Sequence, residues 1–379
     1  METTFGPERM AGQGLDEHQE ESGDRAILAL LTDPTVRDQI DLVITYRRDA
    51  YEVWSARGLV RFRRLLRDGR LAFEVIDKLG TNPIEDQRHT SISTCGEECQ
   101  AASASGHATN DPNLAFIEPS EVSYPHAYER IAQLFDSPYA ADLVISPKCY
   151  TFGLQRGQHG ALDVIQSRAP LAFFGPGIRP GRYDSAPRHV DIAPTICRLM
   201  RFPFIDERDA SGRTASERGV APDVHLKRQD GAPLQEIIDA DAPAPERVYL
   251  VLFDGLSNSE LRHLIDSHDP AIANLRRLLD RSAMFTYGST VNFPSITWPS
   301  HSTIMTGAWC GHHDVVNPTY YDRALRQPLA PQGQGMMTEG YLGSGVETLY
   351  EAFHRVLGPQ AFTANIHEPQ GRGADHAAL

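Results

Sequence analysis

Two residues whose side chains could do chemistry lie in the second half of the chain. Asp254 directly follows the apolar run of residues 248–253, which is typical of a central parallel strand. Open α/β sheets bind ligands at the carboxyl ends of such strands, and a carboxylate there suits zinc, magnesium or manganese. Thr297 stands two residues before Pro299, which suits the first turn of a helix. Thr297 is therefore predicted to lie at a helix start, where free N–H groups favour a bound phosphate.

This pair predicts a metal-assisted attack on phosphorus, in which a cation stabilises the alkoxide of the threonine. The residues alone leave other interpretations open. Asp254 is followed by Gly-Leu-Ser-Asn-Ser, which is also typical of a helix cap, and Thr297 has the residue type of a cap as well. Ser295 and Ser300 compete with Thr297 as nucleophiles on the same evidence.

Longer stretches around both residues resemble a known family. They are Leu-Val-Leu-Phe-Asp254-Gly-Leu and Phe-Pro-Ser-Ile-Thr297-Trp-Pro-Ser-His-Ser-Thr-Ile-Met-Thr-Gly307, with His-Asp-Val-Val-Asn317 after them. Together they resemble the type I phosphodiesterase/nucleotide pyrophosphatase family of the alkaline phosphatase superfamily. The resemblance implies that Thr297 is the nucleophile and a metal ligand, and that Asp254 is a zinc ligand. It also implies two Zn²⁺ ions, with Mg²⁺ or Mn²⁺ as alternatives.

The resemblance departs from the family pattern around the residue expected to bind phosphate. The family's asparagine after the proline is Ser300 here, and the glycine after the histidine is Asp314. The phosphate-binding asparagine of the family falls on Pro318, whereas Asn317 stands one position earlier. Asn317 is therefore the candidate substrate-binding amide.

A second stretch resembles the C-terminal half of the same superfamily, but it comes first in this chain. It contains Gln-His159-Gly and, after it, the run Leu-Ala-Phe-Phe-Gly-Pro-Gly177. In the family the histidine of such a segment is the last zinc ligand, which places that role on His159. The order of the two halves is thus reversed. A fused or rearranged gene, a circular permutant and a truncated product each account for this order.

The middle of the family domain has no clear counterpart in the sequence. The family completes its zinc sites with an Asp-x-x-x-His motif and an Asp-His-Gly motif. Asp375-His376 lacks the glycine and the preceding strand, and Asp86-Gln-Arg-His89 is one residue short. The site is therefore expected to be incomplete in this chain or to be completed by a second chain.

The elements that must position these residues alternate between strand and helix patterns, which predicts an α/β class. With the resemblance, this becomes an alkaline-phosphatase-like α/β/α sandwich that is incomplete or rearranged. Composition suggests a disordered tail over 1–24, a first segment over 25–215, a linker over 216–246 and a nucleophile-bearing segment over 247–379. Strands are expected near 41–46, 51–54 and 248–253, and helices near 258–281 and 299–306.

Composition narrows the possible partners. A formal net charge of −14 argues against a nucleic-acid surface, and no apolar run is long enough to cross a membrane. No apolar stretch in 1–24 could serve as a signal peptide, so a cytoplasmic protein is expected. The five cysteines are odd in number and scattered, which argues against a disulfide framework. The expected partner is a small anionic phosphate ester.

The sequence therefore predicts a metal-dependent hydrolase of phosphodiester or pyrophosphate bonds with a threonine nucleophile. One alternative is a catalytically inactive fragment or pseudoenzyme of the same superfamily. Another is a phosphomonoesterase, or a hydrolase of phosphonate or sulfate esters on the same scaffold.

Overall fold

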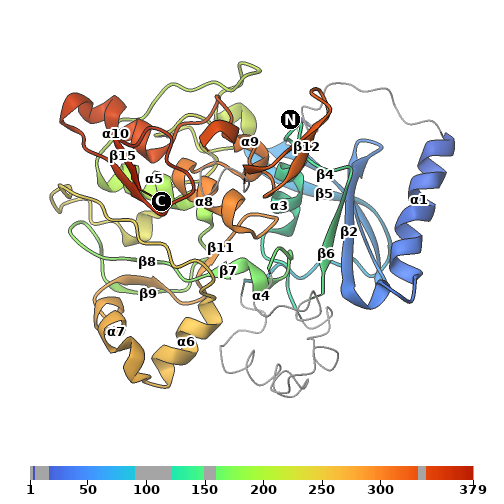
Figure 1. Ribbon diagram of the computed structural model, residues 1–379, viewed down its shortest axis with the longest axis horizontal. Helices are drawn as coiled ribbons and strands as arrows, with labels where there is room; N and C mark the ends of the chain where they lie inside the picture. Colours follow the sequence, from blue (N-terminus) through green and yellow to red (C-terminus); the bar gives the residue numbers. More distant parts are fainter. Residues whose placement is uncertain (1–2, 5–16, 90–121, 149–158, 332–338, 379) are drawn as a thin grey trace.

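The computed structural model describes residues 3–4, 17–89, 122–148, 159–331 and 339–378 (Figure 1). The cysteines Cys95, Cys99 and Cys149 lie outside these ranges. Strands and helices are interspersed along the chain, so the protein is an α/β protein as the pattern predicts.

The first half of the chain builds a sheet from six of the described strands (Figure 1). The strand order is β1-β4-β3-β2-β6, with β5 also paired to β4, and all pairings are antiparallel. The strands are β1 (Thr3–Thr4), β2 (Ile40–Arg47), β3 (Ala50–Ser55), β4 (Gly58–Arg67), β5 (Arg70–Gly80) and β6 (Leu143–Pro147). The strands expected near 41–46 and 51–54 are confirmed as β2 and β3.

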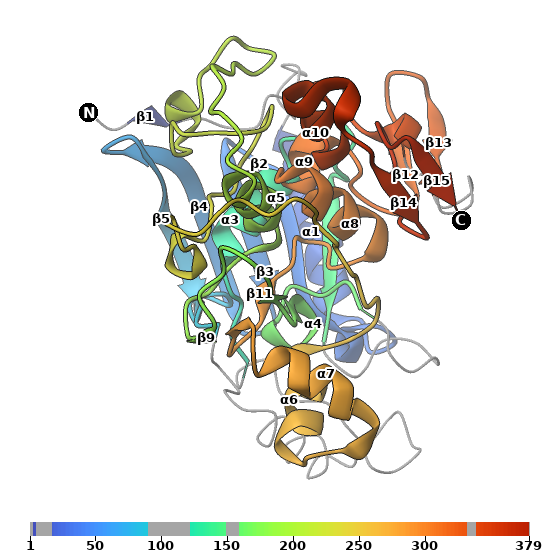
Figure 2. The same cartoon turned by 90° about the vertical axis from the view of Figure 1, so that its left-hand side faces the viewer.

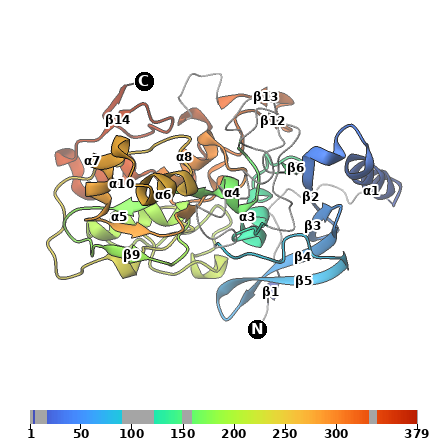
Figure 3. The same ribbon diagram turned by 90° about the horizontal axis from the view of Figure 1, so that it is seen from below.

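One helix covers each face of this sheet (Figure 3). Helix α1 (Glu17–Thr32) lies on the outer face, where Ile27 packs with Val43 of β2. Helix α3 (Ala127–Leu134) lies on the inner face, where Ile131 packs with Leu42 and Ile44. Neighbouring side chains of β2 thus point to opposite faces, as the pleat of a strand requires. The result is a helix–sheet–helix sandwich.

The second half of the molecule consists of short helices and small sheets around a separate core (Figure 2). Its helices are α4 (Val164–Ser167), α5 (Ile192–Leu199), α6 (Asn258–Asp266), α7 (Ala273–Leu279), α8 (Thr297–Thr306), α9 (Cys310–His313) and α10 (Leu349–Leu357). Its strands are β7 (Arg168–Ala169), β8 (Ala172–Phe173), β9 (Gly181–Tyr183), β10 (Ala283–Phe285), β11 (Ser289–Thr290), β12 (Tyr320–Asp322), β13 (Gln327–Leu329), β14 (Ala364–Ile366) and β15 (His376–Ala378). Strand β10 joins β8 and β9, and the other strands form the pairs β7–β11, β12–β13 and β14–β15.

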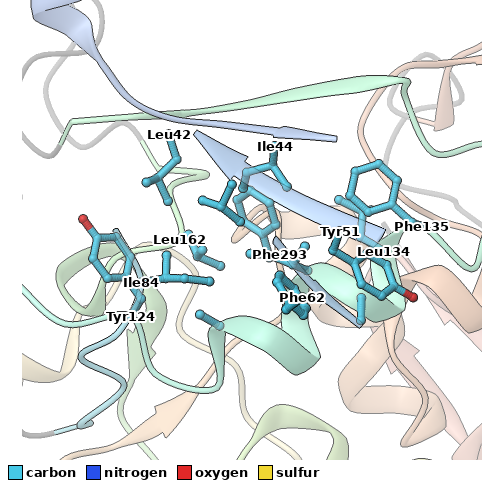
Figure 4. Close-up of a cluster of buried hydrophobic side chains, with 14 of the residues drawn as sticks. Leu42, Ile44, Tyr51, Phe62, Ile84, Tyr124, Leu134, Phe135, Leu162 and Phe293 are labelled. Carbon is cyan, nitrogen blue, oxygen red and sulfur yellow. The ribbon is translucent and has the colours of Figure 1, made fainter. Parts of the chain in front are cut away.

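The core of the first half also holds the loop before α8 (Figure 4). Phe293 from this loop is fully buried among Leu42, Phe62 and Leu162. The loop that carries the candidate nucleophile is therefore attached to the first sheet by a large aromatic side chain, whose burial stabilises the attachment by about 2–3 kcal/mol.

The strand predicted over 248–253 is not formed, which corrects the sequence interpretation. Among the described residues, only the carbonyl of Phe253 in this run accepts a backbone hydrogen bond, from Leu256. Tyr249, Val251 and Phe253 are 82%, 67% and 61% exposed, whereas Leu252 packs on the second core. The run has the alternation of a strand with one face on the core. It lacks a neighbouring strand to pair with its backbone. An apolar pattern without such a partner was not enough to form a strand.

Other boundaries differ from the sequence expectations for local reasons. The helix expected over 258–281 is two helices, because His268 adopts a positive φ and Asp269 then caps the next turn. Helix α1 begins at Glu17, inside the tail expected to be disordered, and its later apolar residues pack on β2. Residues 216–246, expected to be a linker, bury Leu226 and Ile237.

No helix among the described residues is both long and apolar enough to span a membrane.

Candidate active site

The two residues singled out for chemistry meet in the structure. The Thr297 hydroxyl Oγ1 donates a hydrogen bond to Oδ2 of Asp254 at 3.3 Å. Asp254 lies in a turn at the end of the exposed run and is itself exposed, while Thr297 is half-buried. The hydroxyl and the carboxylate therefore share one accessible corner of the molecule, although they are distant in the sequence.

Thr297 is the first residue of α8, as the position of Pro299 predicts. The backbone N–H groups of the first helical turn have no carbonyl partners inside the helix, and the dipole is positive at this end. His313 supports the helix from α9, because its Nε2 lies 3.0 Å from Oγ1 of Thr303 and 3.2 Å from the carbonyl of Pro299. A phosphate beside Thr297 would meet a helix N-terminus that is held in place.

The loop before α8 is held by a buried arginine. Arg130 of α3 is fully buried and donates to the carbonyls of Leu162 and Asn292 and to the hydroxyl of Ser167. Burial lowers the pKa of Arg130 to about 9. Since Arg130 of α3 bonds to the α4 region and to the nucleophile loop, it joins these three segments in one arrangement.

The structure separates Thr297 from the two competing serines. The hydroxyl of Ser295 is buried, where it donates to the carbonyl of Ala161 and accepts from the N–H of Gly160. Ser300 is buried within α8. Of the three candidate hydroxyls, the structure places Thr297 in hydrogen-bond contact with Asp254.

His301 and Glu368, which no motif in the sequence singled out, lie within hydrogen-bond distance of each other, and His301 is close enough to Asp254 to feel its charge. His301 of α8 has its Nδ1 2.7 Å from Oε2 of Glu368, and both side chains are almost buried. Burial disfavours the charged ring, but the hydrogen bond and charge of Glu368 and the charge of Asp254 outweigh it and raise the pKa of His301. The four-residue spacing from Thr297 was a usable signal for His301, whereas no sequence pattern pointed to Glu368.

The predicted zinc ligand His159 lies in a segment that reaches the nucleophile loop. Its side chain is exposed, and the next residue, Gly160, donates to Ser295. A side-chain carbon added at Gly160 would lie 3.6 Å from Ile296, the residue before Thr297. The two segments with reversed order in the chain are thus neighbours in space.

The predicted phosphate-binding residue Asn317 is engaged within its own loop. Its amide nitrogen donates to the carbonyl of Thr319 at 3.2 Å. Among the described residues, the structure shows no hydrogen bond between Asn317 and either Thr297 or Asp254. A role in binding substrate stays a prediction.

The described residues do not fit the expected pair of zinc ions. In the ranges that the structure covers, no three histidine, cysteine, aspartate or glutamate side chains are grouped as a metal site. Asp254 and Thr297 meet, but Asp375 is bonded to Thr363 and lies 3.2 Å from His354. Two zinc ions usually need several such ligands each, so this donor set supports no step through a metal.

Comparison with known proteins gives one family match, which lies in the second half of the chain. No curated protein and no solved structure matches the chain. Residues 248–355 match the family described as type I phosphodiesterase/nucleotide pyrophosphatase. This match contains the exposed run, Asp254 and α8, and it ends within α10, before Glu368. The similarity to this family therefore covers the part of the chain that contains Asp254 and Thr297.

Proposed function

We propose that the protein hydrolyses phosphodiester or pyrophosphate bonds with Thr297 as the nucleophile. The contact between Thr297 and Asp254 at the N-terminus of α8 carries this proposal. The match of residues 248–355 to the type I phosphodiesterase/nucleotide pyrophosphatase family supports phosphoric ester hydrolysis in general. The threonine nucleophile and the choice of a diester are the further steps proposed here.

The reaction has two displacement steps at phosphorus. Oγ1 of Thr297 forms a bond to phosphorus while the bond from phosphorus to the leaving oxygen breaks, which gives a phosphoryl ester of Thr297 that keeps the second substituent of the substrate. Water then attacks phosphorus, and the bond to Oγ1 breaks to release the phosphate product. The N–H groups at the start of α8 stabilise the negative charge of the phosphoryl oxygens in both steps.

Zinc dependence, with magnesium or manganese as alternatives, stays a prediction that solution experiments must test. No step above is assigned to a cation, because the described residues do not supply the ligands of two zinc ions. Chelation and metal addition belong in the first assay for this reason.

A second candidate is a chain that acts only when another polypeptide completes it, or an inactive relative. The exposed run at 248–253 favours this candidate, since its backbone has no strand partner among the described residues. This candidate predicts that the purified chain hydrolyses no phosphate ester with any of the three metals.

The proposed function is tested with bis(p-nitrophenyl) phosphate, with and without added zinc and after chelation. Replacing Thr297→Ala should lower kcat by at least about 10³-fold because the nucleophile is removed. A p-nitrophenyl phosphoryl ester of Thr297 trapped by acid quench should appear in peptides of the wild type and not of the variant. The matched control is Thr35→Ala, which removes an exposed hydroxyl of a distant turn.

Equal activity of the wild type and Thr297→Ala would overturn the threonine mechanism. Activity of neither protein under any metal condition would favour the incomplete or inactive chain.

A further inference from the structure

A large cavity lies where the first sheet meets the second half of the molecule. Its volume is about 1280 Å³, and its lining includes parts of β4 and β5, parts of the segment 208–232 and residues of α9. Neither Asp254 nor Thr297 is among the residues that line it. Ligand pockets in proteins usually have volumes of about 300–1,000 Å³, so this cavity has room for a small molecule.

The lining of the cavity is more basic than the protein as a whole. The chain has a formal net charge of −14, whereas eight arginine or lysine side chains and six aspartate or glutamate side chains line the cavity. A wall that is locally positive in an acidic protein raises the concentration of anions at that place and not elsewhere on the surface.

The buried charges of this lining are paired with one another. His312 of α9 lies between two carboxylates, with Nδ1 2.6 Å from Oδ2 of Asp230 and Nε2 2.8 Å from Oδ2 of Asp136. Since both carboxylates accept, both ring nitrogens carry a proton and the ring is a cation. Arg64 of β4 donates to both oxygens of Asp136. These four side chains are at most 11% exposed, and their two positive and two negative charges balance.

Three cations at the rim of the cavity have no such partner. Arg70 at the start of β5, Arg208 and Lys227 are exposed, and none of them forms an ion pair with a residue that the structure describes. Arg208 donates to a carbonyl, that of Gly212, which leaves its charge in place. Of the six acidic side chains in the described lining, Asp68 is the exposed one. The rim therefore has three cations against one carboxylate.

Further donors lie on the same wall as Lys227. The N–H of Glu347 donates to the carbonyl of Lys227, which holds the turn 343–345 beside this lysine. The turn has the sequence Gly-Ser-Gly, and Ser344 and Gly345 are exposed residues of the cavity lining. A Cβ added at Gly345 would meet no atom within 4 Å, so the wall is open there. The hydroxyl and backbone N–H groups of such a turn suit phosphate oxygens.

We propose that this cavity binds a small anion with two linked phosphate groups. Arg70, Arg208 and Lys227 neutralise its charges, and the turn 343–345 donates to its oxygens. Two linked phosphates carry several negative charges in a small volume, which matches a rim with several unpaired cations. The inference is independent of the proposed function, because it concerns a cavity that the candidate nucleophile does not line.

The test is isothermal titration calorimetry of the full chain with methylenediphosphonate in the presence of EDTA. This probe has two linked phosphonate groups, and a hydrolase of phosphoric esters does not cleave its P–C–P bridge. We expect Arg70→Gln, Arg208→Gln and Lys227→Gln each to raise Kd by about 3–10-fold, because each removes one charge that neutralises the anion. Raising NaCl from about 50 to about 500 mM should raise Kd by at least about tenfold, because the rim cations are exposed to salt.

Arg179→Gln is the matched control, because Arg179 is an exposed arginine outside the cavity. Its Kd should equal that of the wild type. The methylene analogue of ADP is the second probe, and it distinguishes a free diphosphate from a nucleotide. Tighter binding of this analogue, lost in the same rim variants, would mean that the cavity also holds the nucleoside. Circular dichroism and the melting temperature show whether each variant is folded.

The outcomes separate this inference from the proposed function. No binding of either probe would overturn the anion site. Equal Kd values for the wild type and all three rim variants would also overturn it, because the anion would then lie elsewhere. Thr297→Ala should bind the probe as the wild type does, whether or not it hydrolyses phosphate esters. Full hydrolytic activity of Thr297→Ala would therefore overturn the proposed function and leave the anion site standing.

Discussion

Two apolar runs of this chain have similar composition, but one forms a strand paired on both sides and the other forms no strand. Strand β2 lies between β3 and β6, and Leu42, Val43 and Ile44 are fully buried. The run over 248–253 has no strand at either side among the described residues, and every residue of it except Leu252 is exposed. The difference shows that apolar β-forming residues supply the tendency to pair, while burial requires neighbouring strands and a covering helix.

The aspartates of the two runs differ in the same way. Asp41 of β2 is buried, and it accepts hydrogen bonds from Arg57 and from the hydroxyl of Tyr124. Burial raises its pKa, and the charge of Arg57 opposes this shift. Asp254 is exposed at the end of its run, where it accepts from Thr297. One carboxylate is enclosed within the fold, and the other is accessible to a ligand.

Removing the cation beside the enclosed aspartate should have the largest effect on stability. We expect Arg57→Ala to cost about 3 kcal/mol of unfolding free energy at pH 7, because it leaves a buried carboxylate without its charge partner. The pKa of Asp41 is raised in the folded state and should rise further in this variant. The deficit relative to wild type should therefore grow as the pH rises above 3.8 and shrink as the pH falls toward it.

Urea unfolding at pH 5 and pH 8 measures this difference. Arg63→Ala serves as the control, because Arg63 pairs with Glu74 on an exposed part of the same sheet. A deficit that is the same at both pH values would contradict the buried-charge explanation.

A smaller loss should follow from shortening a buried valine of β2. We expect Val43→Ala to lower the unfolding free energy by about 2 kcal/mol, because it removes two buried methyl groups and leaves a cavity between β2 and α1. The shift of the urea midpoint at constant m-value measures the loss. No change would mean that α1 does not cover β2 in solution.

A valine-to-alanine substitution in the exposed run of residues 248–253 should have the smallest effect on stability. We expect Val251→Ala to change the unfolding free energy by no more than about 0.5 kcal/mol, because Val251 is 67% exposed. A loss as large as that of Val43→Ala, measured under identical conditions, would show that something covers this run in solution. Dilution of the protein would then reveal whether the cover is a second copy, since its effect would depend on concentration.

Local signals were sufficient for several elements of the fold and for the position of Thr297, the candidate nucleophile, at a helix start. Pro299 and the hydroxyl residues around it predicted a helix, and α8 begins at Thr297. The apolar pattern of β2 predicted its strand. In contrast, β5 was not predicted, because Arg70–Gly80 is largely exposed and its position depends on pairing with β4. The two strands are joined directly at Asp68-Gly69, a dipeptide typical of hairpin turns, so a local signal for this pairing was present in the sequence.

The sequence by itself determined the residue types that could react at phosphorus, the helix that presents Thr297, and the family that residues 248–355 resemble. The tertiary structure decided which groups surround that hydroxyl. It brought Asp254 to Thr297 and Glu368 to His301, and it left residues 248–253 without a strand partner. Spacing along one helix follows from the helical repeat, whereas contacts between separate segments depend on how the whole chain packs.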